Sequence, residues 1–290
     1  MDRQALHIWT MQQRALRVAE IAVTTLDAAR VRALPVKGVV LARQVYDPAS
    51  RPISDIDLVI EPASFRRVLG IARKAGWPLV WDTRLLGSVN VVIEGFAVDV
   101  KSSLGPPGLS LVGADRVLAR AAWSEQPLGF PHWQIEQHDH ALLLAIDAFK
   151  DGLGTGKAWA REDLVRIAAM KGFSTSTLVE RAASACLQTM LAIVAEWVLS
   201  SGVSRAWCSV RDELGAHFLR SAYLVRYRRW LDTRARSRWA RLYQSALTRT
   251  VSDSFRQRGL AVALSVAGTA KYLVRHRGFD VDAWRAARRL

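Results

Sequence analysis

The chain has 290 residues, enough for one large domain or two of ordinary size, and we expect two. Half of the residues are hydrophobic and 23% are charged, a balance that excludes a disordered chain and predicts a substantial core. Lys and Arg number 41 against 26 Asp and Glu, so the net charge of +15 favours a polyanionic partner such as a nucleotide, nucleic acid or an anionic membrane, unless the Arg excess only reflects a GC-rich genome.

The N-terminal part begins with a long helix, which we predict over residues 1–30. Apolar residues follow helical spacing there, and the segment contains neither Gly nor Pro. A short extended segment over 34–37 follows, and after Gly38 a helix is predicted over 39–46. The order is therefore strand, glycine, helix.

A second strand is predicted over residues 55–60. Side chains alternate between the two faces of a strand, so Asp55 and Asp57 point to the same side, together with Val59. The next predicted elements are a helix over 65–74, capped by Ser64 and stopped by Gly76, and a hairpin with strands over 88–94 and 96–101 that turns at Glu94-Gly95. In the second hairpin strand, Asp99 and Lys101 share one face.

The chain becomes helical almost throughout from about residue 136. Two apolar stripes are expected, one formed by Leu142, Ala145, Ile146 and Phe149 and the other by Leu178, Ala182, Cys186, Met190, Ile193 and Trp197. The predicted fold class is α+β, with an α/β domain over residues 1–135 and an all-helical domain over 136–290.

The two cysteines, Cys186 and Cys208, are both expected in helices, and they lack metal-ligand spacing. Without a CxxC pair or a signal peptide, we expect a cytoplasmic protein that has no disulfide. Two apolar stretches, 189–203 and 260–274, are each interrupted by a charge and are shorter than the roughly 20 residues of a membrane span. We expect them to be buried helices and predict no membrane span.

The most specific pattern is Lys37-Gly38 followed, after about a dozen residues, by Arg51-Pro52-Ile53-Ser54-Asp55-Ile56-Asp57-Leu58. This pattern resembles the DNA polymerase β-like nucleotidyltransferase superfamily, and within it an uncharacterised bacterial nucleotidyltransferase family with a Lys-Gly pair, a Tyr, an Arg and a Ser-Asp-Ile-Asp-Leu run. The resemblance covers roughly residues 30–170. It implies transfer of a nucleoside monophosphate from a nucleoside triphosphate (NTP) to a hydroxyl or phosphate, with release of pyrophosphate; ATP is favoured by prior expectation only.

The chemistry explains the predicted catalytic and metal-binding residues Asp55, Asp57 and Asp99. Transfer from a triphosphate depends on positioning and on neutralising phosphate charge, which Mg²⁺ or Mn²⁺ does when carboxylate oxygens hold it. Asp55 and Asp57 alone would fit an ordinary solvated strand, and the upstream Gly motif favours catalysis. Asp82 and Glu94 compete for the third position, but the strand face and the family pattern favour Asp99, which is also a candidate general base.

The predicted nucleotide-binding residues are Lys37, Gly38, Arg51, Ser54 and Lys101. Gly38 permits a close approach of phosphate to the start of the next helix, and the cationic side chains suit phosphate oxygens. Two positions depart from the family, since Val39 replaces a small residue and Lys101 stands where relatives often have His. Each cation fits a surface charge or an ion pair as the alternative.

Three further motifs carry weaker signals. The run Gly152–Lys157 resembles a phosphate-binding loop but has the wrong spacing, so we interpret it as an interhelical loop. His138-Asp139-His140 lacks a third metal ligand, and Asp139 fits the cap of a helix. Lys150 and Asp163 occupy polar positions that match the family's next helices.

The Arg-rich stretch 220–241 is the most basic part of the chain and contains interleaved Tyr and Trp residues. It suits RNA, but a solvated helix face with its aromatics in the core is the preferred interpretation. The acceptor is therefore left open among a small molecule or peptide, which we slightly prefer, RNA and protein. The alternative function is a non-catalytic nucleic-acid-binding protein on a degenerate nucleotidyltransferase scaffold.

Overall fold

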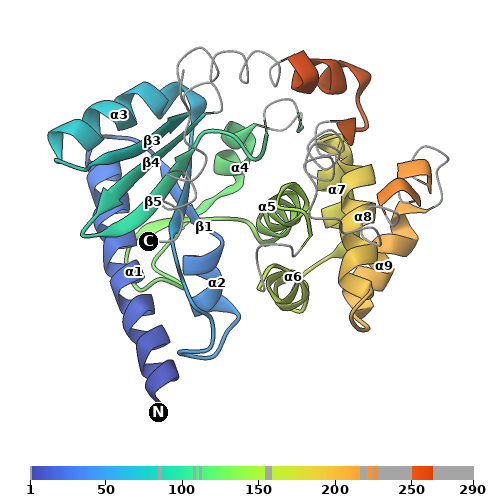
Figure 1. Ribbon diagram of the computed structural model, residues 1–290, viewed down its shortest axis with the longest axis horizontal. Helices are drawn as coiled ribbons and strands as arrows, with labels where there is room; N and C mark the ends of the chain where they lie inside the picture. The colour runs from blue at the N-terminus through green and yellow to red at the C-terminus, as the bar shows by residue number, and fades with distance from the viewer. Residues whose placement is uncertain are drawn as a thin grey trace, which may run out of the picture.

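The computed structural model describes residues 2–83, 87–106, 109–110, 113–153, 159–215, 221–223, 225–227 and 250–263. This part of the chain has a mixed α+β fold, in which a five-stranded sheet precedes a run of helices (Figure 1). The predicted fold class is therefore confirmed.

The elements of the first half lie within two residues of most of the predicted boundaries. They are α1 (Arg3–Ala28), β1 (Ala33–Val36), α2 (Gly38–Gln44), β2 (Ile56–Ile60), a 3-10 turn (Pro62–Ser64), α3 (Phe65–Lys74), β3 (Leu79–Thr83), β4 (Ser88–Ile93), β5 (Phe96–Lys101), α4 (Ala114–Arg120), β6 (Ala122–Ser124) and β7 (His132–Gln134). One expectation is wrong: Ser64 makes no side-chain hydrogen bond to the start of α3, because it sits in the preceding 3-10 turn with helical backbone angles.

The sheet has the strand order β1-β2-β5-β4-β3, and its register positions the predicted acids. β2 pairs in parallel with β5, while β1 with β2, β5 with β4 and β4 with β3 pair antiparallel. The hairpin of β4 and β5 turns at Glu94 and Gly95, whose φ angles of 48° and 75° fit the type I′ turn that matches strand twist.

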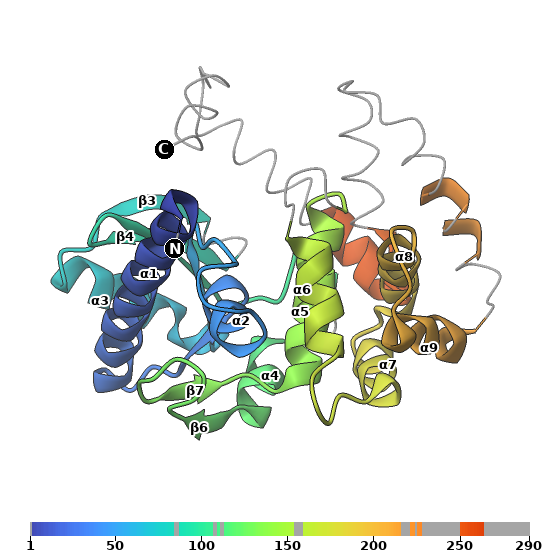
Figure 2. The same cartoon turned by 90° about the horizontal axis from the view of Figure 1, so that it is seen from below.

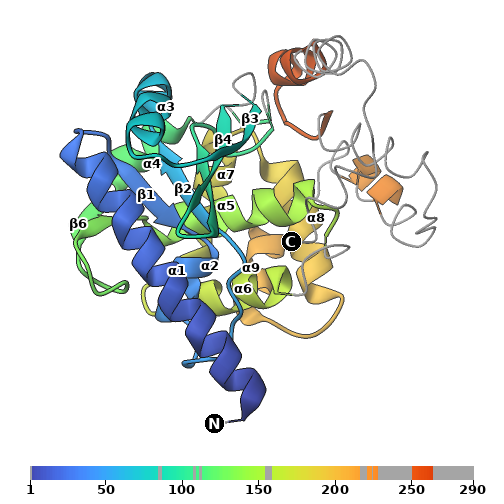
Figure 3. The ribbon, with the colours of Figure 1, turned by 60° about the vertical axis from the view of Figure 1, so that its left-hand side comes forward.

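The two faces of the sheet belong to two hydrophobic cores. Helices α1 and α3 cover one face, where Ile56, Leu58 and Val98 are buried (Figures 1 and 3). The other face contributes Leu34 and Val59 to a core that it shares with α4 and the later helices, as expected for strands that are covered on both sides. The helical half is thus packed against the sheet face that carries Asp57.

The helical half contains α5 (Gln137–Lys150), α6 (Ala160–Ala168), α7 (Thr175–Ser184), α8 (Gln188–Leu199) and α9 (Arg205–Leu214). Figure 2 shows α5 and α6 next to the sheet half and α7 to α9 beyond them. The division into domains at residue 135 stays a prediction, although α5 begins two residues later.

The second predicted stripe is two helices and not one. Cys186 has a φ of 55°, and the Leu187 N–H donates to the Ala182 carbonyl at 2.8 Å, which closes α7 with a Schellman turn. The expectation of a helical Cys186 is therefore wrong, whereas Cys208 lies in α9. The pattern concealed this break because the turn has Cys where Gly is usual.

The apolar stretch from residue 189 is largely α8, which is buried, as predicted. The other stretch lies largely outside the described residues. Among the described helices, none is both long and apolar enough to cross a membrane.

Candidate active site

The predicted carboxylates lie where β2 and β5 run side by side. Parallel pairing places Asp57 directly opposite Asp99. Asp57 is buried, with 6% of its surface exposed, whereas Asp55 directly precedes β2 and is exposed. The carboxylate of Asp55 accepts a hydrogen bond from Ser54 Oγ at 3.0 Å. The structure therefore brings Asp57 and Asp99 together and leaves Asp55 in an exposed position at the start of the strand.

Lys101 joins these two carboxylates. Its Nζ lies 2.5 Å from Asp57 Oδ1 and 2.7 Å from Asp99 Oδ2. Ser88 Oγ donates to the other oxygen of Asp99 at 2.8 Å. Burial alone would lower the pKa of Lys101, but the surrounding carboxylates, Asp57 first, raise it well above its usual value. Lys101 is a fixed cation at the centre of the site.

Lys37 supplies a second ammonium from the turn between β1 and α2. Its Nζ lies 3.0 Å from Asp57 Oδ1 and 2.8 Å from Asp147 Oδ1 on α5. Burial would raise the pKa of Asp57, but Lys37 and then Lys101 outweigh it and hold this pKa at about 2. Because an isolated buried charge is costly, these groups stabilise one another only as a set.

The backbone of Lys37 is also held by α5. Its φ of 58° lies in the left-handed region, which costs a residue other than Gly on the order of 1 kcal/mol or more. The N–H of Lys37 donates to His140 Nε2 at 2.8 Å. Burial first, and then the charges of Lys37 and Arg51, lower the pKa of His140 to about 3, so its ring is a neutral acceptor. The strained turn thus depends on a neutral His140.

Arg51 lies against Gly38 on the other side of this turn. A Cβ added to Gly38 would lie 3.0 Å from Arg51 Nη1, so the absence of a side chain here lets the guanidinium approach the backbone closely. Arg51 forms two hydrogen bonds of 2.7 Å with the carboxylate of Asp163 on α6, which also accepts from the Tyr46 hydroxyl at 2.8 Å. Lys37, Gly38 and Arg51 are therefore neighbours, as their shared motif predicts.

The helical half contributes groups that the sequence analysis did not assign to the active site. Asp147 binds Lys37 and, at 2.9 Å, Lys150, while His140 holds the Lys37 backbone. Asp163, a weak candidate from the sequence, is the partner of Arg51. A usable signal was present, because Asp147 interrupts the apolar run of α5 and a buried acid requires a cationic partner.

The residue set suits a divalent cation in its chemistry. Asp57 and Asp99 offer neighbouring carboxylate oxygens, the ligands that Mg²⁺ prefers. In the described part of the chain, no three His, Cys, Asp or Glu side chains form a group that could hold a metal ion. The ammonium of Lys101 contacts both carboxylates, which shows that these two neighbouring negative charges are balanced by a cation in this structure. The two carboxylates fit a cation, and Asp55 stays a predicted third ligand.

The remaining motifs have structural roles where they are described. Asp139 does not cap α5; the cap is Glu136, and Asp139 is paired with Arg120 at 2.7 Å. In the run Gly152–Lys157, only the first two residues are described. Most of the Arg-rich stretch also lies outside the described residues, but within it Tyr227 is buried and Arg226 is exposed, as a solvated helix face requires.

Comparison with known proteins identifies a family and a similar solved structure. A family described as uncharacterised nucleotidyltransferase matches residues 4–198. The solution structure of the antibiotic-resistance factor ANT(2'')-Ia is similar over 60% of this chain and 92% of that chain, with 15% identity and a TM-score of 0.43. No curated protein matches the sequence.

Proposed function

The chain belongs to this family of nucleotidyltransferase enzymes, and from that premise we propose that the cluster of Asp57, Asp99, Lys37 and Lys101 binds an NTP with Mg²⁺ or Mn²⁺ and transfers its nucleoside monophosphate. The observation that carries the proposal is the register of β2 and β5, which sets Asp57 beside Asp99. Both acids are in contact with the ammonium of Lys101.

The residues of the site divide the work by charge. Asp57 and Asp99, joined by Asp55, would hold the divalent cation, which neutralises charge on the triphosphate when it is bound. Lys37 and Lys101 neutralise the acids in the absence of substrate, and their ammonium groups then bind phosphate oxygens as the triphosphate enters. Cationic charge is thus present at the acids both before and after substrate binding.

Arg51 and Gly38 form the proposed second contact with the triphosphate. Gly38 leaves room for an approaching group, and the Arg51 guanidinium lies at that place now, held by Asp163. A guanidinium that is fixed bidentately by a carboxylate keeps N–H donors in a defined direction. Ser54 is proposed to contact phosphate from its exposed position, with Asp55 orienting its hydroxyl.

The reaction is a displacement at the α-phosphorus. The acceptor oxygen forms a bond to this phosphorus, the bond to the oxygen that bridges the α- and β-phosphorus atoms breaks, and pyrophosphate leaves. If the acceptor is a hydroxyl, its proton passes to the carboxylate of Asp99, the proposed general base. We propose a small molecule or a peptide as the acceptor class in preference to RNA, because the two described aromatics of the Arg-rich stretch pack in or against the core. Tyr227 is buried, and Tyr223 is half-buried, with its hydroxyl donating to the Thr250 carbonyl at 2.6 Å.

The test uses NTPs labelled at the α- or the γ-phosphorus. The protein is incubated with Mg²⁺, each of the four labelled NTPs in turn, and a cell lysate, and the lysate is then separated into small molecules, peptides, RNA and protein. We expect label in one acceptor fraction from the α-labelled NTP only. Transfer from the γ-labelled NTP would show phosphoryl transfer and contradict the proposal.

A matched pair of variants connects the label to the site. Asp57→Asn should abolish transfer, because it removes a ligand and leaves the shape of the side chain unchanged. Glu94→Gln, at an exposed acid of the β4–β5 turn, should transfer like the wild type. Transfer by Asp57→Asn within tenfold of the wild type would exclude the proposed site.

A further inference from the structure

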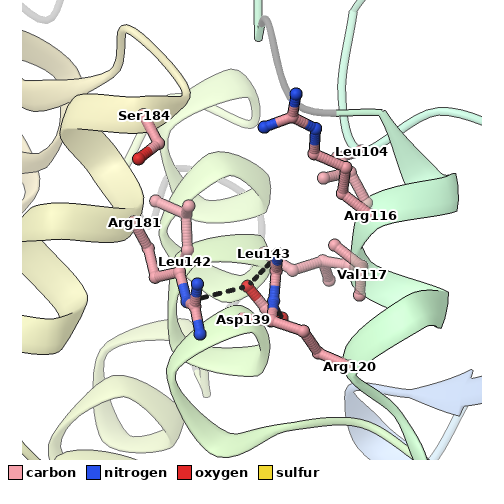
Figure 4. A pocket seen from close by; sticks show the side chains of 9 residues that line it. All are labelled: Leu104, Arg116, Val117, Arg120, Asp139, Leu142, Leu143, Arg181 and Ser184. Carbon is pink, nitrogen blue, oxygen red and sulfur yellow. Dashed lines mark hydrogen bonds and ion pairs between the residues drawn. The ribbon is translucent and has the colours of Figure 1, made fainter.

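A second cationic site lies outside the cluster described above, in a cavity between α4, α5 and α7. Its volume is about 70 Å³. Figure 4 shows three guanidinium groups, one carboxylate and one hydroxyl around it, with leucine and valine side chains among them. The polar lining residues are Arg116, Arg120, Asp139, Arg181 and Ser184.

The charges of this cavity do not balance. Asp139 is buried and is the one acid among the lining residues. Arg120 occupies both of its oxygens through two hydrogen bonds of 2.7 Å. Three arginines against one aspartate leave a net charge of about two, since guanidinium groups stay protonated in proteins.

Arg181, which lines the cavity, has a donor without a partner. Its Nε is buried and has no hydrogen-bond partner within the described residues, and the nearest oxygen of Asp139 is 3.8 Å away, too far for a hydrogen bond. A buried donor without a partner destabilises the protein, and a bound acceptor that reaches it would remove this cost. Arg116 lies at the exposed rim, where it can close on a ligand.

We propose that this cavity binds a phosphate group. A water-sized group needs about 10–15 Å³ by this measure of volume, so the cavity has room for roughly the four oxygens of a phosphate. A phosphate monoester carries a charge of about −1.5 to −2 at neutral pH, which matches the excess of two guanidinium groups, whereas a carboxylate would leave one unmatched. Ser184 adds a neutral donor.

The place of the cavity connects it with the acceptor. Leu104 lines it and follows Lys101 by three residues, so the two Cα atoms are at most about 11 Å apart. The cavity is thus near the end of β5 along the chain, and an acceptor held there by its phosphate would have to extend from the cavity toward Asp99. This role rests on the proposed function and predicts a phosphorylated acceptor, whereas phosphate binding itself requires no nucleotide.

Calorimetric titration with inorganic phosphate tests the site, without NTP and with chloride holding the ionic strength constant. Arg181→Gln should weaken phosphate binding roughly tenfold, the loss expected for a charge-assisted hydrogen bond. Asp139→Asn should strengthen binding, because it removes the one negative charge and keeps an acceptor for Arg120. Arg67→Gln, on the exposed face of α3, is the matched control and should bind like the wild type.

Opposite changes in the two cavity variants would support the proposal. Equal phosphate affinity in the wild type and Arg181→Gln would overturn it, since the bound phosphate would then lie elsewhere. If Arg181→Gln does not fold, Arg116→Gln at the rim carries the same test. If the wild-type protein binds phosphate but transfers no nucleotide, the proposed function is contradicted and the phosphate site is still supported.

Discussion

His140 provides a sharp test of how the helical half supports the site. Its ring accepts the N–H of Lys37 and is buried with a pKa of about 3, against 6.5 for an ordinary histidine. The native state therefore keeps His140 neutral at a pH where the unfolded chain binds a proton. For a base with a lowered pKa, stability is full above pH 6.5 and is lost as the pH falls from 6.5 toward 3.

The magnitude follows from the proton that the unfolded chain binds. Between pH 7.5 and pH 5 this linkage should lower the free energy of unfolding by about 2 kcal/mol, at about 1.4 kcal/mol for each pH unit below 6.5. The value requires only that the native pKa lie below 5. In His140→Gln, the side-chain carbonyl can accept the same N–H and does not titrate, so this contribution should vanish.

Urea denaturation of both proteins at pH 7.5, 6.5, 5.8 and 5.0 measures the difference. We expect the wild type to lose about 2 kcal/mol more than His140→Gln across this range. His132, whose pKa is also lowered by burial, is present in both proteins and cancels. Equal pH slopes would show that His140 is accessible to protons, and the proposed support of the Lys37 turn would be wrong.

Three substitutions probe the remaining contacts. Asp163→Asn should lower the free energy of unfolding by about 3 kcal/mol, because it leaves the Arg51 guanidinium buried without a carboxylate. Asp212→Asn, which breaks an exposed ion pair, should lower it far less in the same urea titrations. Lys101→Met should tighten Mn²⁺ binding in the absence of nucleotide roughly tenfold, since it removes the ammonium that contacts both carboxylates. Unchanged Mn²⁺ affinity would show that Lys101 does not compete with the metal ion for these carboxylates. Gly38→Ala should raise the KM for NTP several-fold, because the new methyl group displaces Arg51, while the free energy of unfolding should change by less than about 1 kcal/mol. An unchanged KM in steady-state kinetics would show that neither Gly38 nor the position of Arg51 matters for NTP binding.

Local chemistry made much of the fold predictable. The alternation in β2 put Asp57 and Val59 on one face, and Gly76 and Glu94-Gly95 marked turns that the structure contains. The break at Cys186 was not predictable in this way, because hydrogen bonds close the end of α7 there without a glycine. Helical periodicity continued across the turn, so the pattern indicated one helix.

The site was predictable on its sheet side and not on its helical side. Asp57 and Asp99 follow from strand alternation and a shared motif, but their pairing depends on the parallel crossover between β2 and β5. Asp147 and His140 are more than 100 residues from Lys37, and no local pattern specifies contacts over that separation. The sequence contained only the general sign that a polar residue in an apolar helix needs a partner.

Binding of Mn²⁺ with an NTP analogue that cannot be cleaved between the α- and β-phosphates tests the central claim most directly. The signal of free Mn²⁺ in electron paramagnetic resonance should fall when the wild-type protein and the analogue are both present. The account predicts that Asp57→Asn and Asp99→Asn each abolish this loss of signal, while Glu94→Gln retains it. Wild-type binding of Mn²⁺ and nucleotide by Asp57→Asn would contradict the assignment of the site.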